Sequence, residues 1–173
     1  MNNKTKMLII IGFWLFLALF AVIQNEKIFF AGDEILLKVQ PVDPRDFLRG
    51  QYVQLKYDIG TIPVKKSEHF AHKETIYVTL KKEGKFYSAK KISKNAPKIL
   101  GAEEKYIKGR IDFILYSSRY GKDYNDIRIV YGIENFFTKE SEAKAIEKSL
   151  AAGGIAKIKL DKKGRAKIIG VEQ

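Results

Sequence analysis

The chain opens with an unbroken apolar run, and that run limits what everything after it can fold into. Met7 to Ile23 are 17 apolar or small residues, with Lys4 and Lys6 before them and a strongly charged remainder after them. As a helix this run would be about 26 Å long, near the lower limit for crossing a hydrocarbon core of about 30 Å. We therefore predict a transmembrane anchor over residues 7–23.

The charges beside the run predict its orientation. Lysines next to a span stay on the cytoplasmic side, whereas long domains are translocated with little regard to their own charge. Lys4 and Lys6 therefore predict a cytoplasmic tail of residues 1–6 and an extracytoplasmic domain of residues 24–173, in a single-pass protein of the cytoplasmic membrane. The alternative is a cleaved secretory signal, but this run exceeds the usual length of about 7–15 residues and no A-x-A triplet closes it.

Composition limits the chemistry of the domain. The chain has no cysteine, so disulfides and thiolate metal sites are excluded. The length after the span suits one domain with its own core. The chain carries a net charge of +12, almost all of it beyond the span, and such a surface attracts polyanions.

The positive charge is densest in a segment near the end of the chain. Strand-like alternation there puts lysines on one face and Ala156, Ile158 and Leu160 on the other. The segment could be a solvated edge that discourages strand pairing, or a patch for anionic lipid or an envelope polymer. Nucleic acid is not expected, because the domain is extracytoplasmic and no binding motif is present. The candidate basic patch is Lys157, Lys159, Arg165 and Lys167.

The periodicity of the domain is that of strands. Two hairpins are predicted, over residues 75–91 and 154–171, with turns that end in Gly84 and Gly164. Further strands are predicted over residues 106–116 and 126–133. One helix is predicted over residues 139–150, capped by Thr138 and ended by Gly153. The fold class is thus mostly β: one antiparallel β-rich domain, a sandwich or open barrel, with one peripheral helix, behind a transmembrane helix.

Two Gly-led segments repeat one pattern. Gly32 to Val39 and Gly50 to Tyr57 both carry apolar residues at their fourth, sixth and eighth places. These places share one face of a strand, so the two segments should pack into a common core as neighbouring strands.

The segment that joins them gathers opposite charges in a short stretch. Asp43 can cap a single helical turn that Pro44 begins, which explains the turn structurally. Its two carboxylates and two guanidinium groups also suit a ligand or partner site, because guanidinium pairs well with carboxylate or phosphate. These charged residues are Asp43, Arg45, Asp46 and Arg49.

At this point the chain resembles a known family. The octapeptide Gly50 to Tyr57, preceded by Val42 to Asp46 and followed by Tyr131 to Glu134, is similar to the bacterial GDYXXLXY proteins, with Gln51 in place of the motif Asp. The resemblance implies a small membrane-anchored protein of unknown function, an accessory to other membrane proteins. The candidate interaction site is Asp43, Arg45, Asp46, Arg49, Tyr52, Tyr57, Tyr131 and Glu134.

Catalytic and metal-binding patterns are weak in this chain. A Ser-Lys hydrolase would need one of the serines that lie near lysines, but no nucleophile motif surrounds them. His69 and His72 could share a helical face, yet two histidines alone make no metal site. The serines are Ser88, Ser93, Ser117 and Ser118.

We therefore expect no cofactor, and a membrane-anchored, extracytoplasmic interaction module that acts with another membrane protein and is not an enzyme. The alternatives are a membrane-tethered Ser-Lys hydrolase and a domain that binds polyanions or anionic lipid.

Overall fold

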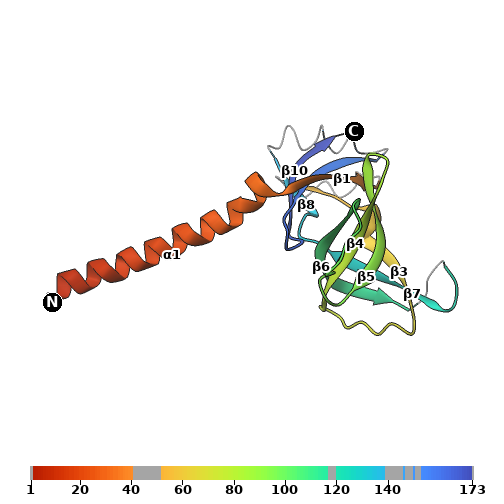
Figure 1. Ribbon diagram of the computed structural model, residues 1–173, viewed down its shortest axis with the longest axis horizontal. Helices are drawn as coiled ribbons and strands as arrows, with labels where there is room; N and C mark the ends of the chain where they lie inside the picture. Colours follow the sequence, from red (N-terminus) through yellow and green to blue (C-terminus); the bar gives the residue numbers. More distant parts are fainter. Residues whose placement is uncertain are drawn as a thin grey trace.

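The fold consists of one long N-terminal helix and a β domain that follows it. A computed structural model describes residues 2–40, 52–116, 120–138, 146, 150 and 153–172, without side-chain detail for residues 24–31 and 52. Helix α1 (Asn3–Ala31) projects from the domain in Figure 1. Its first 21 residues, Asn3–Ile23, are long and apolar enough to cross a membrane, and none of the apolar window is buried. The helix starts before the predicted run and continues eight residues beyond it.

The domain is built from ten strands and a short 3-10 helix within the described residues. Buried apolar residues alternate with more accessible residues in β1 and β9, as expected for sheets with one face on the core. The elements are β1 (Asp33–Val39), β2 (Tyr52–Gln54), η2 (Asp58–Gly60), β3 (Thr61–Lys65), β4 (Thr75–Glu83), β5 (Phe86–Ser93), β6 (Glu104–Leu115), β7 (Tyr124–Val130), β8 (Asn135–Phe137), β9 (Gly154–Leu160) and β10 (Ala166–Glu172).

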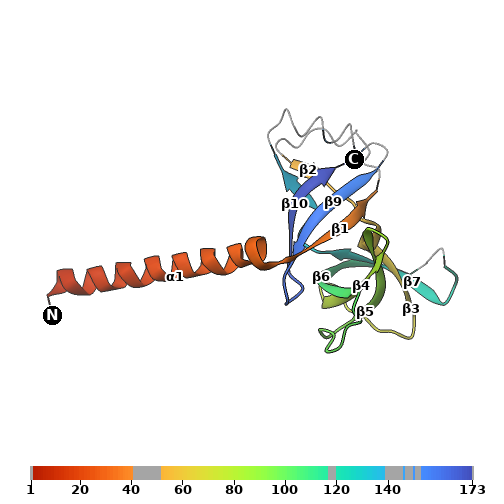
Figure 2. The same cartoon turned by 45° about the horizontal axis from the view of Figure 1, so that its top comes forward.

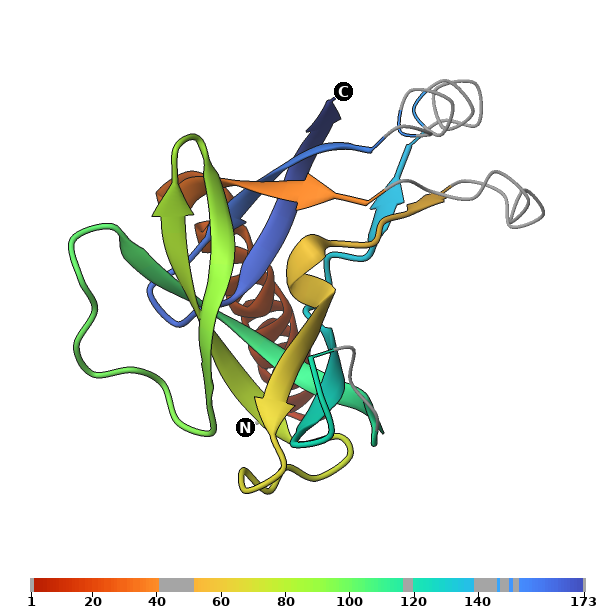
Figure 3. The same cartoon turned by 90° about the vertical axis from the view of Figure 1, so that its right-hand side faces the viewer.

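The strands form three antiparallel sheets around one core. Their orders are β1-β9-β10, β2-β8 and β3-β7-β6-β4-β5. Three register shifts, in the β4–β5, β6–β7 and β9–β10 pairs, are the kind of irregularity that bends a sheet. Figures 2 and 3 show the three-stranded sheet against the five-stranded one, with the strands surrounding a common interior. The predicted β-rich class is confirmed: the antiparallel strands together make a nearly closed arrangement.

Both predicted hairpins are confirmed. The β4–β5 turn contains Gly84 at φ +63°, and the β9–β10 turn contains Gly164 at φ +75°. Both values lie in the left-handed region that glycine adopts without a steric penalty.

The repeated Gly-led pattern also places its apolar residues as predicted, but not in one sheet. The three apolar residues of each copy are buried in the same core cluster. β1 pairs with β9, whereas β2 pairs with β8, and an isolated β-bridge joins the two copies at Val39 and Tyr57. The six core residues are Ile35, Leu37, Val39, Val53, Leu55 and Tyr57.

The structure corrects the strand predicted over residues 126–133. β7 ends at Val130, because Gly132 at φ +82° turns the chain out of the extended conformation. β3 and β8 were not predicted. The predicted helix over residues 139–150 lies outside the described residues except for Ile146 and Leu150, which pack against the core.

Candidate functional site

Two buried tyrosines join residues 52–59, which we call the motif segment, to residues 131–134, which follow β7. The Tyr57 hydroxyl donates a hydrogen bond to the Ile133 carbonyl at 2.6 Å. The Tyr131 hydroxyl donates to the Ile59 carbonyl at 2.7 Å. Burial, and secondly the charge of Glu134, raise the pKa of both phenols well above the ordinary value, so both remain hydrogen-bond donors at neutral pH.

Glu134 holds the turn between β7 and β8 in place. Its carboxylate accepts hydrogen bonds from the amides of Tyr131 at 2.6 Å and Gly132 at 2.9 Å. Its own carbonyl accepts the Leu55 amide at 2.7 Å, which joins the turn to the motif segment. A turn satisfied by one side chain in this way holds a fixed conformation.

A groove of about 390 Å³ opens beside this structure. The motif segment contributes the run Gln54–Tyr57 to one wall, and Asp112 and Arg128 contribute charges from β6 and β7. Glu134 and Asn135 close the groove next to the tyrosine-bonded turn. We call this the motif groove.

Arginine and aromatic side chains border the motif groove. The Arg128 guanidinium carbon lies 5.3 Å from the centroid of the Phe113 ring, and Arg128 Nε lies 4.0 Å from Asp112 Oδ2. Phe137, which follows the groove residue Asn135 by two positions, is 73% exposed. Arginine and aromatic residues are enriched in protein interfaces, and a half-exposed ion pair of this length contributes little to stability.

The structure brings together three residues of the predicted interaction site. Tyr57 and Glu134 line the motif groove, and Tyr131 is a buried residue of the turn. Tyr52 is described only in its backbone, as the first residue of β2. The remaining four, Asp43, Arg45, Asp46 and Arg49, lie outside the described residues.

The predicted basic patch is engaged within the domain. Lys157 forms an ion pair with Glu172, which raises the pKa of the lysine. Lys159 Nζ donates to the Gly32 carbonyl at 3.2 Å, and Arg165 Nε lies 2.7 Å from Asp161 Oδ2. Lys167 lies opposite Lys159 in the register of β9 and β10.

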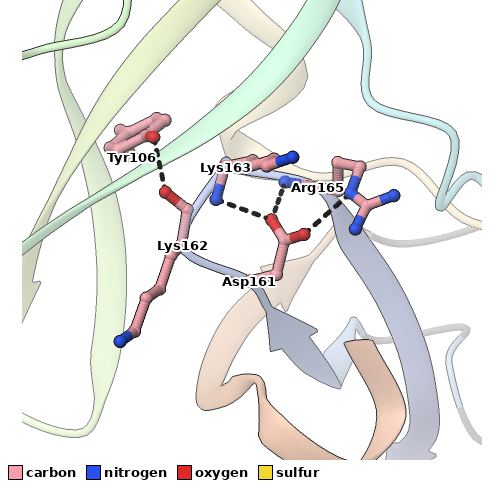
Figure 4. Close-up of polar contacts among 5 residues, drawn as sticks. All are labelled: Tyr106, Asp161, Lys162, Lys163 and Arg165. Atoms are coloured by element: carbon pink, nitrogen blue, oxygen red, sulfur yellow. Dashed lines mark hydrogen bonds and ion pairs between the residues drawn. The ribbon is translucent and has the colours of Figure 1, made fainter. Parts of the chain in front are cut away.

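The β9–β10 turn is docked onto β6, as Figure 4 shows. Asp161 accepts hydrogen bonds from the amides of Lys163 at 2.9 Å and Arg165 at 2.8 Å, besides its bond to Arg165 Nε. Tyr106 donates from its hydroxyl to the Lys162 carbonyl at 2.7 Å. Burial opposes ionisation of Asp161, but these hydrogen bonds outweigh it and lower the pKa of the carboxyl.

The predicted basic patch included Arg165 but not Lys108, Arg110 and Lys163, which line a second hollow next to this turn. Two cavities of about 450 and 290 Å³ share Lys108 and Arg165, and the first also includes Arg110 and the second Lys163. Neither cavity is lined by a carboxylate. The signal was present, because Lys108 and Arg110 alternate along β6 with the buried Ile107 and Ile111.

The residues weighed for catalysis have other contacts. Ser88 donates to Glu83 Oε2 at 2.9 Å and Ser93 donates to the Asn95 carbonyl at 2.8 Å. Ser117 and Ser118 lie outside the described residues. His69 and His72 are exposed, and over the described part of the chain no group of three or more His, Asp or Glu side chains could hold a metal ion.

Fold and site together define a class of protein: a nearly closed antiparallel β domain, fastened by paired tyrosines, behind one N-terminal helix long and apolar enough to span a membrane. Within the octapeptide, Leu55 and Tyr57 lie in the core. The chain belongs to the GDYXXLXY protein family, which matches residues 14–171, nearly the whole chain. No curated protein and no solved structure matches it.

Proposed function

We propose that the protein is a membrane-anchored interaction module whose domain lies outside the cytoplasm and binds another protein of the same membrane. Helix α1 supports the anchor, because its apolar part projects from the domain and has no protein partner among the described residues (Figure 1). Lys4 and Lys6 support the orientation, because cations beside a span are retained in the cytoplasm.

The proposed binding function rests on the motif groove. It combines a concave surface with the Arg128 and Asp112 charges, and the exposed Phe113 ring lies against Arg128. An arginine stacked on an aromatic ring is already held in place, so less side-chain entropy is lost when a partner binds. This arrangement supports a protein partner that offers a carboxylate to Arg128 and apolar surface to Phe113.

The absence of cysteine makes the topology directly testable. A single thiol at Asn135→Cys, on the groove, should react with a membrane-impermeant maleimide in intact cells. A single thiol at Asn3→Cys, at the start of α1, should react only after the cells are permeabilised. The reverse pattern would refute the orientation.

The partner is tested by photo-crosslinking from the intact chain in its native membrane. A photoreactive residue at Asn135 should capture one integral membrane protein, identified by mass spectrometry. The same residue at Lys91, which is exposed on β5, is the position control. Capture from Asn135 should also be lost on Arg128→Ala. Equal products from both positions, or a product unaffected by Arg128→Ala, would contradict a partner in the motif groove.

A further inference from the structure

The register of the three-stranded sheet places the β9–β10 turn beside the end of the anchor. β1 begins at Asp33, two residues after α1 ends at Ala31. Asp33 lies opposite Leu160, the last residue of β9, and Leu160 lies opposite Ala166, the first residue of β10. The turn of residues 161–165 therefore extends past the start of β1, to the side from which α1 leaves the domain, as Figures 1 and 2 both show.

β6 brings further cations to the same end. Lys105 near the start of β6 forms an ion pair with Asp33 at 2.5 Å, so the first half of β6 lies beside the start of β1. The Lys108 amide donates to the Gly164 carbonyl at 2.7 Å, which joins β6 directly to the turn. The two cavities that share Lys108 and Arg165 thus lie at the end of the domain nearest the anchor. We call them together the cationic groove.

Most of the charge in the cationic groove is uncompensated. Arg165 is paired with Asp161, but over the described residues no carboxylate pairs with Lys108, Arg110 or Lys163. All three side chains belong to exposed residues. Tyr106 and Tyr77 meet edge to face, with ring centroids 5.8 Å apart, and give the smaller cavity a firm aromatic wall. Such a site favours a small anion over a neutral or cationic group.

The distance to the membrane fits a headgroup. The eight helical residues after Ile23 separate the domain from the apolar run by about 12 Å. The headgroup region covers roughly 5–8 Å of that interval, and charges interact across a Debye length of about 8 Å at physiological ionic strength. The few ångströms that remain between the headgroups and the domain are within the length of a lysine or arginine side chain.

We propose that Lys108, Arg110, Lys163 and Arg165 form a binding site for the phosphate groups of anionic lipid headgroups in the membrane that α1 spans. The inference rests on the anchor in the proposed function. Its consequence is an anchored domain held down on the bilayer by a second, electrostatic contact, with the motif groove left open.

The test uses the full chain in lipid nanodiscs. A single fluorophore on Lys162→Cys, in the turn, is quenched by nitroxide carried on lipid headgroups. Discs of phosphatidylcholine alone are compared with discs that also contain phosphatidylglycerol. Quenching should be stronger in the anionic discs and should weaken with added salt. A fluorophore on Lys122→Cys, beyond the far end of β6, should show no difference.

Two triple variants separate a site from mere net charge. Lys108→Gln with Arg110→Gln and Lys163→Gln should lower the apparent affinity for the anionic lipid at least about tenfold. The matched variant Lys65→Gln with Lys66→Gln and Lys122→Gln removes the same charge from exposed residues at the far end and should change it little. Equal losses from both triples, or no loss from the first, would overturn the proposal.

Two further outcomes identify other causes. Inorganic phosphate added at constant ionic strength should not reverse the quenching, and a reversal would show a site for free phosphate in place of the headgroup. Failure of the chain to enter phosphatidylcholine discs at all would refute the anchor, and with it the proposed function, before any anionic lipid is added.

Discussion

The hydroxyl of Tyr57 and the hydroxyl of Tyr131 each bind the main chain two residues beyond the other tyrosine. The two bonds span 76 and 72 residues of sequence and are both buried. They fasten the motif segment and the segment after β7 at two points. A reciprocal pair of this kind resists rotation of one segment against the other, which a single bond would allow.

Removing either hydroxyl should destabilise the domain. Tyr57→Phe and Tyr131→Phe each leave a buried carbonyl without its donor, at a cost of about 1–3 kcal/mol in the free energy of unfolding. Urea unfolding measures the loss. Tyr116→Phe is the control, because Tyr116 is 78% exposed and its hydroxyl should contribute little. Equal, negligible effects at all three positions would contradict the importance of the paired bonds.

The same hydroxyls should govern stability in alkali. The pKa of each is raised by burial, and then by Glu134, above the ordinary value of 10.0. The unfolded chain therefore releases these protons first, and stability that is complete below pH 10 falls as the pH rises further. Two such groups give a slope of about 2.7 kcal/mol per pH unit. The double variant Tyr57→Phe, Tyr131→Phe should lose that slope, and an unchanged slope would assign the effect to other groups.

The hairpins were predictable because their causes are local. A glycine with positive φ lies in each turn, and alternation on both sides marks the strands. β8 was missed because three residues, Asn135–Phe137, are too few to show alternation. β3 was missed because Pro63 disguises an edge strand. The segment 131–133 was predicted as strand because it continues the apolar pattern of residues 126–130, although Glu134 folds it into a turn.

The candidate site was less predictable than the fold. The sequence could show that Tyr57, Tyr131 and Glu134 belong to one family pattern, but not that their contacts are with each other's backbone. The sequence also did not show that Lys157 of the predicted basic patch pairs with Glu172 across the hairpin. Such long-range contacts depend on register, which no local pattern contains.

Gly164 should tolerate substitution less well than Gly84. Both residues have positive φ, so alanine costs about 1–2 kcal/mol at either position. A Cβ on Gly164 would also come within 2.7 Å of the Tyr106 ring, whereas a Cβ on Gly84 meets nothing within 4 Å. Gly164→Ala should therefore cost about 1–3 kcal/mol more than Gly84→Ala. Thermal unfolding compares them, and equal costs would show that the turn does not press on β6.

Asp161 should make the domain sensitive to acid. Its pKa is lowered in the folded protein, so its contribution is present at neutral pH and is lost as the pH falls below about 4 and through the folded value. Asp161→Asn should cost about 1–3 kcal/mol at neutral pH, because Arg165 loses its charged partner. Urea unfolding at neutral and acid pH should show the two proteins converging in acid. A difference independent of pH would mean that the charge of Asp161 is unimportant.

Helix α1 passes without a break from the apolar run to Ala31, and only Gly32 separates it from β1. A continuous helix of this kind sets the rotation of the domain around the helix axis as well as its distance from the apolar run. Each residue added between Ile23 and Gly32 would lift the domain by about 1.5 Å but swing it by about 100° around the helix axis. For a partner that contacts both the span and the domain, the number of residues in this helical connection would therefore determine which face of the domain is turned towards it.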